Sequence, residues 1–173
     1  MTADVIDRPS WSGDGGRLVY AASGADGQLG LWIVPAEGGA PAAIPDVRGR
    51  APAWSPQEDL IAYSTSATTG LEMRFTGSQG ESRLKQRTVA TGSVGVTAFS
   101  WDGRWLAQGY TPGAGDAEIV LVDLERGEKR SVLRLGPFSE VTGVAWSADD
   151  ARLVYGLVQR ESRVLLFDGL GRY

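Results

Sequence analysis

A six-residue phrase that occurs four times constrains this chain more than any other feature of its sequence. The copies read SWSGDG at 10–15, AWSPQE at 53–58, AFSWDG at 98–103 and AWSADD at 145–150. Their aromatic residues fall at positions 11, 54, 99 and 146, so the repeat is 43 to 47 residues long. A repeat of this length is typical of architectures in which one unit cannot bury its own apolar faces and stacks on its neighbours.

Each repeat divides into four expected β-strands. The first ends at the aromatic residue, and the Ser-x-Asp-Gly that follows suits a turn, because Asp bonds nearby backbone and Gly accepts a positive φ. A near-continuous apolar strand comes next, for example at 18–21 and 153–156, as expected where both faces of a strand are covered. A third apolar strand ends in a Gly-bearing hairpin turn. No stretch has a convincing helical period, so we predict an all-β fold.

The expected fourth strand is more polar than the other three. Residues 82–88 and 128–134 carry several Lys and Arg side chains among smaller or apolar ones. We interpret these segments as outer edge strands that their charge protects from stray pairing. A nucleic-acid-binding patch is the alternative, but the net charge of −4 argues against it because that partner requires a basic face.

The composition excludes several kinds of chemistry. The chain has no Cys and no His, which removes disulfides, thiolate chemistry, Ser-His-Asp triads and imidazole metal ligands. No apolar run approaches the roughly 18 residues of a membrane helix, so we expect no membrane insertion. Residues 1–8 lack the apolar stretch of a secretory signal. The compartment is left open: cytoplasmic by default, periplasmic or extracellular if a signal has been removed.

The aromatic-Ser-x-Asp-Gly phrase, followed by a strand such as Leu-Val-Tyr, resembles the TolB-like or WD40-like (PD40) β-propeller repeat. It is also similar to repeats in the propeller domains of prolyl-oligopeptidase-type peptidases, and the resemblance covers essentially the whole chain. The pattern departs from true WD40 repeats, because the pair Trp101 and Asp102 lies in the first turn rather than at the end of the third strand. The resemblance implies a domain that binds a partner or gates a neighbouring catalytic domain. The nucleophile motif Gly-x-Ser-x-Gly is absent from the sequence.

We therefore expect one all-β propeller domain over residues 1–173, with four-stranded antiparallel blades at about 9–47, 48–90, 94–135 and 141–173. The last repeat stops after its third strand, and we expect residues 2–7 to close that blade. The ring is expected to be larger, with about eight blades, and to be completed by a second copy of the chain or by a companion chain. A closed four-bladed propeller is the first alternative, and a non-propeller β-sandwich is the second.

The expected function is a non-catalytic module that binds a protein partner or ligand, with no cofactor and no metal. Binding is expected on the ring face that carries the second-to-third and fourth-to-first loops, where Arg and aromatic side chains are common anchors. The candidate contacts are Arg48, Arg50, Asp116, Phe138 and Glu140. The alternative is the propeller fragment of a larger hydrolase. If the chain were an enzyme, Asp116, Glu118 and Glu140 would be its carboxylates, although no pair has a diagnostic spacing.

The repeated phrase itself is interpreted as structural. Asp14, Asp102 and Asp149 could be acids or metal ligands, but one carboxylate per repeat is too dispersed for a calcium loop. We therefore assign them to turns. The expected blade motif consists of Trp11, Ser12, Asp14, Trp54, Ser55, Phe99, Ser100, Asp102, Trp146, Ser147 and Asp149.

Overall fold

The computed structural model describes residues 8–67, 70–80, 93–111, 116–136 and 139–159, and within these ranges it contains strands and no helix. The strands form four antiparallel sheets, one for each copy of the phrase. The first sheet holds β1 (Ser10–Trp11), β2 (Arg17–Ser23), β3 (Leu29–Pro35) and β4 (Ala42–Arg48). The second holds β5 (Arg50–Trp54), β6 (Ile61–Ala67) and β7 (Gly70–Thr76). The third holds β8 (Ser93–Phe99), β9 (Trp105–Thr111), β10 (Glu118–Asp123) and β11 (Lys129–Arg134), and the fourth β12 (Ser139–Trp146) and β13 (Leu153–Gln159).

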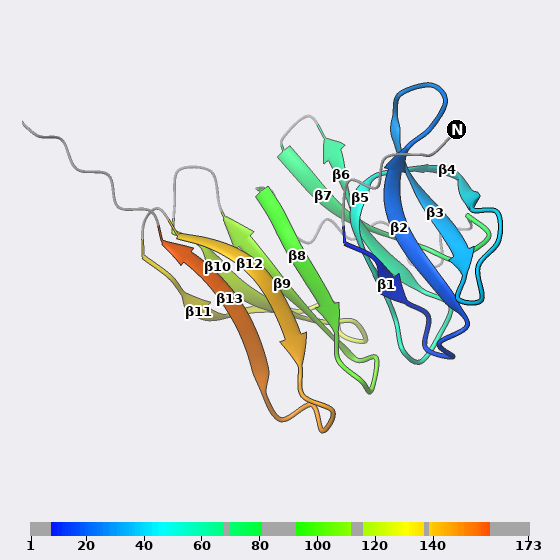
Figure 1. The fold of residues 1–173 in the computed structure, drawn as a ribbon. Helices are drawn as coiled ribbons and strands as arrows, with labels where there is room; N and C mark the ends of the chain where they lie inside the picture. Colours follow the sequence, from blue (N-terminus) through cyan, green and yellow to red (C-terminus); the bar gives the residue numbers. More distant parts are fainter. Residues whose placement is uncertain (1–7, 68–69, 81–92, 112–115, 137–138, 160–173) are drawn as a thin grey trace, which may run out of the picture.

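The sheets follow one another in chain order, with β2–β4 at one end of the molecule and β12 and β13 at the other (Figure 1). The first strands of neighbouring sheets contact each other, β1 with β5, β5 with β8, and β8 with β12. First strands that contact one another on one side, with later strands stacked outward, are the arrangement of propeller blades. We call the sheets blades 1 to 4. The all-β propeller fold expected from the repeats is thus confirmed.

Three apolar clusters hold the blades together, one in each interface between neighbours. They follow from the alternation of side chains along strands covered on both faces. In β2, for example, Val19 and Ala21 face blade 2, where they pack with Ile61 and Tyr63. Equivalent clusters join blades 2 and 3 around Met73, Phe75 and Leu106, and blades 3 and 4 around Ile119, Leu135 and Val141.

The backbone hydrogen bonds of the first turn fix which positions correspond between blades. In each blade the amide of the motif Ser donates to the carbonyl five residues later, at 2.8–2.9 Å. The residues that accept these bonds are equivalent: Arg17, Leu60, Trp105 and Arg152. The strand registers give two further equivalent sets: Ser10, Ala53, Ala98 and Ala145 on the first strands, and Val19, Ala62, Ala107 and Val154 opposite them.

The two end blades share no apolar cluster within the described residues, although Arg8, just before β1, lies near Gly143 of β12. None of the three clusters joins blade 4 to blade 1. Val154, on the outward face of blade 4, is 66% exposed, whereas Val19 at the equivalent position of blade 1 is fully buried. The described blades therefore form an arc rather than a closed four-bladed ring, which is consistent with part of a larger propeller.

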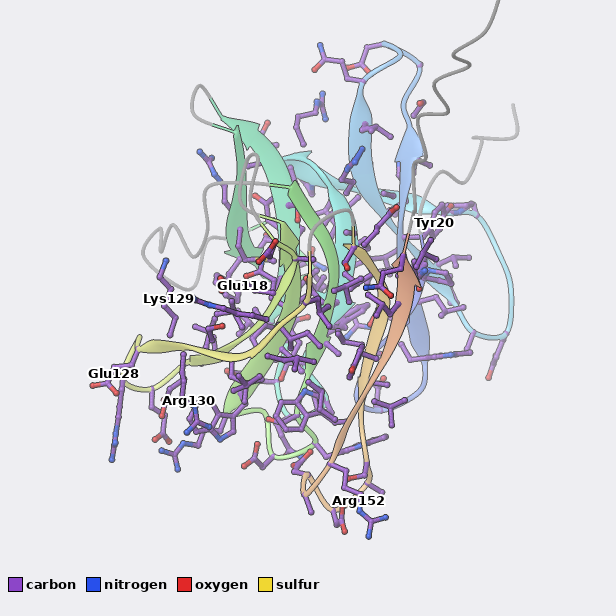
Figure 2. All side chains as sticks on the ribbon, turned by 90° about the vertical axis from the view of Figure 1, so that its left-hand side faces the viewer. Tyr20, Glu118, Glu128, Lys129, Arg130 and Arg152 are labelled. Atoms are coloured by element: carbon purple, nitrogen blue, oxygen red, sulfur yellow. The ribbon has the colours of Figure 1, made fainter. Side chains whose placement is uncertain are left out.

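The expected fourth strands are present where the structure describes them, as β4 and β11. β11 is the outer edge of its sheet, nearly all of its residues are exposed, and Figure 2 shows Glu128, Lys129 and Arg130 along this edge. The segments 2–7 and 82–88, together with the third strand of the last repeat, lie outside the described residues. No described helix is long and apolar enough to cross a membrane.

The tight interface between blades 3 and 4 predicts the effect of a small substitution in β9. A Cβ atom at Gly109 would lie 2.7 Å from both Val96 Cγ2 and Val141 Cγ1. We expect Gly109→Ala to lower the free energy of unfolding by about 1–3 kcal/mol through overpacking, measured by urea denaturation. Gly136→Ala is the matched control, because its Cβ would meet only one atom, at 4.0 Å. Equal stability of the two variants would contradict this packing.

Candidate functional site

The residues proposed from the sequence as binding contacts are not gathered into a pocket. Arg48 forms an ion pair with Asp26 at 3.1 Å, with both side chains about half exposed. Arg50, Asp116 and Glu140 are exposed, and Phe138 lies outside the described residues. Whether this face binds a partner stays a prediction.

The carboxylates proposed for catalysis are not gathered at one site either. Glu118, on β10, pairs with Arg134 of β11 at 3.2 Å. Asp116 precedes β10, whereas Glu140 lies on β12 in the next blade. Among the described residues, no group of three or more Asp, Glu, His or Cys side chains could hold a metal ion.

A cleft lies at the end of the blades where the first strands run into their turns, opposite the end that carries the second-to-third and fourth-to-first loops. Its volume is about 510 Å³, and it is lined mainly by apolar groups of blades 1 to 3. The aromatic walls are Trp11, Trp54, Phe99 and Trp101. Trp54 and Phe99 are buried blade residues, but Trp11 and Trp101 are each 55% exposed. Apolar clefts with few polar groups are the usual form of a binding site.

The turns that border this cleft are built by the Ser and Asp of the repeated phrase. In blade 3 the Ser100 hydroxyl donates to Asp102 Oδ1 at 2.6 Å, and the same carboxylate oxygen accepts the Arg104 amide at 2.9 Å. Ser100 Oγ in turn accepts the Trp105 amide at 2.8 Å. Blades 1 and 4 repeat these bonds through Ser12 with Asp14 and Ser147 with Asp149. In these three blades the Ser and Asp side chains thus bond to each other and to the backbone of their own turn.

The same bonds set the acidity of the three carboxyl groups. Two hydrogen bonds lower the pKa of Asp14, Asp102 and Asp149 below the ordinary value: the bond from the Ser hydroxyl has the larger effect, and the bond from a backbone amide has the next largest. Both contacts stabilise the charged form more than the neutral one. These groups are therefore negatively charged at neutral pH and are poorly suited to act as general acids.

Neighbouring turns are linked to one another across the blades. Gly13 packs against Pro56 so closely that a Cβ atom there would lie 2.0 Å from the Pro56 carbonyl oxygen. The Gln57 side-chain amide donates to the Trp101 carbonyl at 2.6 Å. On the other side, the Asp150 carboxylate accepts the Trp101 amide at 2.7 Å and the Asp102 amide at 2.9 Å. Blades 2 and 4 thus hold the backbone of Trp101 from both sides.

Asp150 adopts an unusual backbone conformation to form these bonds. Its φ is +55°, in the left-handed region, where Gly15 and Gly103 occupy the equivalent turn positions with φ of +70° and +74°. Asp tolerates this region better than most residues but still at a cost relative to Gly. Glycine at this position would have no carboxylate to accept the Trp101 and Asp102 amides. The less favourable backbone of Asp150 is therefore accompanied by two hydrogen bonds that restrain the Trp101 turn.

Trp101 is the functional candidate that the sequence interpretation missed. It occupies the second position of the turn, where the other copies have Gly13, Pro56 and Ala148. A large apolar side chain at a turn position otherwise held by small residues or Pro is a detectable signal. The repeat pattern does not reveal its role, because every position of the phrase also suits a turn or a blade interface.

A narrower cavity continues along the first strands beyond the cleft. Its volume is about 190 Å³, and its lining includes Ser10, Pro52, Thr97 and Val144, one from each blade. The Thr97 hydroxyl is buried with no hydrogen-bond partner in the structure, so a water molecule is its expected partner. This cavity lies where the first strands of the four blades converge and has room for several water molecules.

No protein-family model and no curated protein matches the chain, but several solved structures do. TolB from Acinetobacter baumannii superimposes with a TM-score of 0.73 and 18% identity, covering 88% of this chain and 37% of that one. A putative TolB from Agrobacterium tumefaciens gives 0.72 and 18%, covering 91% and 61%. The β-propeller domain of the Trilobed protease from Pyrococcus furiosus, described as having an open velcro topology, gives 0.62 and 17%, covering 82% and 45%.

These similarities confirm the TolB-like propeller resemblance at the level of the fold. The chain spans 37% of the first TolB structure and 61% of the second. At these identities the likeness carries over the arrangement of the blades.

The lowered pKa values predict how stability responds to acid. Because the carboxyl groups are more acidic when folded than when unfolded, they stabilise the fold above the unfolded pKa of about 4. That stabilisation is lost as the pH falls through the lower folded pKa values of Asp14, Asp102 and Asp149. We expect the triple Asp→Asn variant to be less stable at pH 7 and to lose less stability between pH 7 and 3, measured by thermal unfolding. Parallel pH profiles for variant and wild type would contradict the assignment.

The clamp on Trp101 predicts a local effect of Asp150→Gly. Glycine adopts the positive φ without strain, so the turn should form while the two bonds from the carboxylate are lost. We expect amide hydrogen exchange at Trp101 and Asp102 to accelerate at least about tenfold, measured by NMR. The Gly103 amide is the internal control, because it donates to the Ser100 carbonyl at 3.0 Å instead. Unchanged exchange at Trp101 would show that Asp150 does not restrain the turn.

Proposed function

We propose that the chain is a non-catalytic binding module that takes an apolar or aromatic segment of a protein partner into the cleft beside Trp101. One observation carries the proposal: an exposed Trp whose backbone amide and carbonyl are held by the turns of two neighbouring blades. Trp is enriched among residues that dominate binding energy. A side chain on a fixed backbone also loses less conformational freedom on binding.

The charges around the cleft favour one kind of segment. The turns that border it carry the carboxylates of Asp14 and Asp102, whose lowered pKa values keep them ionised. The chain as a whole has a net charge of −4. A segment with an aromatic or Pro side chain beside Lys or Arg complements such a site, whereas an acidic segment would be repelled.

The alternative function is that of a propeller fragment of a larger hydrolase. The likeness to the propeller domain of a protease supports it. The absence of His and Cys from the sequence and the separation of Glu118 from Glu140 on different blades favour the non-catalytic role. A serine-reactive activity probe distinguishes the two: labelling of this chain alone would contradict a binding module.

Selection of a random dodecapeptide library on the immobilised full chain tests the proposed site. We expect enrichment of peptides that combine an aromatic or Pro residue with a basic one. Trp101→Ala should weaken the binding of an enriched peptide by about 30-fold or more, the loss of 2 kcal/mol that defines a dominant contact residue, measured by fluorescence anisotropy of the labelled peptide.

The control is a variant at the opposite end of the blades. Arg48→Ala with Arg50→Ala removes two of the contacts proposed from the sequence and should leave binding unchanged. If this variant loses binding while Trp101→Ala retains it, the binding face lies at the second-to-third loops and the cleft assignment is wrong.

A further inference from the structure

Trp11 stands out among the four aromatic residues that end the first strands. Trp54 and Phe99 at the equivalent positions are 4% and 9% exposed, whereas Trp11 is 55% exposed. Trp11 pairs across the strands with Leu18, as Trp54 pairs with Ile61. Because the second of these pairs faces the preceding blade, the Trp11 ring lies on the face of blade 1 that has no described blade before it.

The interfaces inside the arc show what covers such a ring. Between blades 1 and 2, the Arg17 guanidinium lies over the Trp54 ring, 4.8 Å from its centroid, and Ser10 Oγ accepts the Trp54 amide at 2.9 Å. Between blades 3 and 4, Trp146 Nε1 donates to the Ala98 carbonyl at 3.1 Å. In each case the preceding blade offers partners from its first strand or from the residue after its turn.

Blade 4 carries the same partners on its outward side with nothing against them in the described structure. Arg152 is the equivalent of Arg17, is exposed, and stands at the tip of the β12–β13 hairpin, pointing away from the ribbon (Figure 2). Ala145 is the equivalent of Ala98. Val154 and Val158, 66% and 41% exposed, share the outward face with Ala145.

We propose that the outward face of blade 4 receives blade 1 of a second copy of this chain, so that two copies join head to tail into one ring. Arg152 of one copy would cover the Trp11 ring of the other, as Arg17 covers Trp54, and the Ala145 carbonyl would face the Trp11 indole N–H. The second copy is the occupant because this chain carries both halves of the interface, and the interface continues the one that already joins its blades. A two-fold rotation about the propeller axis makes both seams identical and closes the assembly.

Sedimentation velocity of the full chain at 5–100 µM tests this inference. We expect a species of twice the chain mass of 18.4 kDa. Val154→Lys should dissociate it, because the equivalent residues of the internal interfaces, Val19, Ala62 and Ala107, are fully buried. Val132→Lys is the matched control, since Val132 is 42% exposed on the outer edge strand β11 and lies outside the seam. A wild-type monomer over this range, a larger open series, or equal effects of the two Lys variants would overturn the proposal.

A mixing experiment tests the pairing of Arg152 with Trp11 itself. Trp11→Ala or Arg152→Ala alone damages both seams of the ring, and each should raise the dissociation constant at least about tenfold. In an equimolar mixture, Arg152 of the first variant can cover Trp11 of the second, which restores one seam. We therefore expect the mixed dimer to be more stable than either variant dimer. A mixture that behaves like the average of its parts would overturn the pairing. The Arg152 variant leaves the cleft lining unchanged, so peptide binding and dimer formation can fail independently.

Discussion

The structure depends on one constraint: a blade is a sheet with two apolar faces and cannot be stable alone. Its strands need cover on both sides, and only another blade provides a surface of matching shape and periodicity. The three clusters between blades satisfy this requirement for the inner interfaces, where Val19, Leu31, Ile61, Leu106 and Ile119 are at most 1% exposed. Each side chain at these interfaces is thus constrained both by its place in its own strand and by the neighbouring blade that covers it.

The turns, unlike the blade interfaces, are stabilised by contacts between residues that are close together in the sequence. In blades 1, 3 and 4 the Ser-Asp turn closes the first hairpin within six residues, using a hydroxyl and a carboxylate that bond their own backbone. Blade 2 lacks the Asp, and Ser55 Oγ there accepts only the Gln57 amide, at 3.3 Å. The Gln57 side chain is instead directed to the Trp101 carbonyl. A departure from the repeat consensus has therefore become a link between blades, as has Asp150 at a position where glycine would be less strained.

The fold could be predicted from the sequence because the repeat imposes the same four strands at each copy. The first strands, the apolar second strands and the charged edge strand β11 all follow from patterns that one blade determines locally. The restrained backbone of Trp101 could not be derived in this way, because it results from hydrogen bonds of Gln57 and Asp150 on two other blades. The candidates Arg48 and Arg50 follow only from residue type on an expected loop. The structure shows Arg48 engaged with Asp26 across the same blade, a contact that no repeat pattern encodes.

The exposed aromatic residues follow from the same constraint by two routes. Trp101 is exposed because it stands in a turn, where no blade can reach it, and its backbone is nevertheless fixed from both sides. Trp11 is exposed although it stands in a blade-facing position, where its equivalents Trp54 and Phe99 are buried and Trp146 is half-buried. Exposing a large apolar side chain to water costs free energy in either place, so each Trp favours a partner that covers it. The turn residue suits a ligand that enters the cleft, and the blade residue suits another blade. The proposed ligand site and the proposed assembly surface therefore lie side by side, because Trp11 and Trp101 line the same cleft.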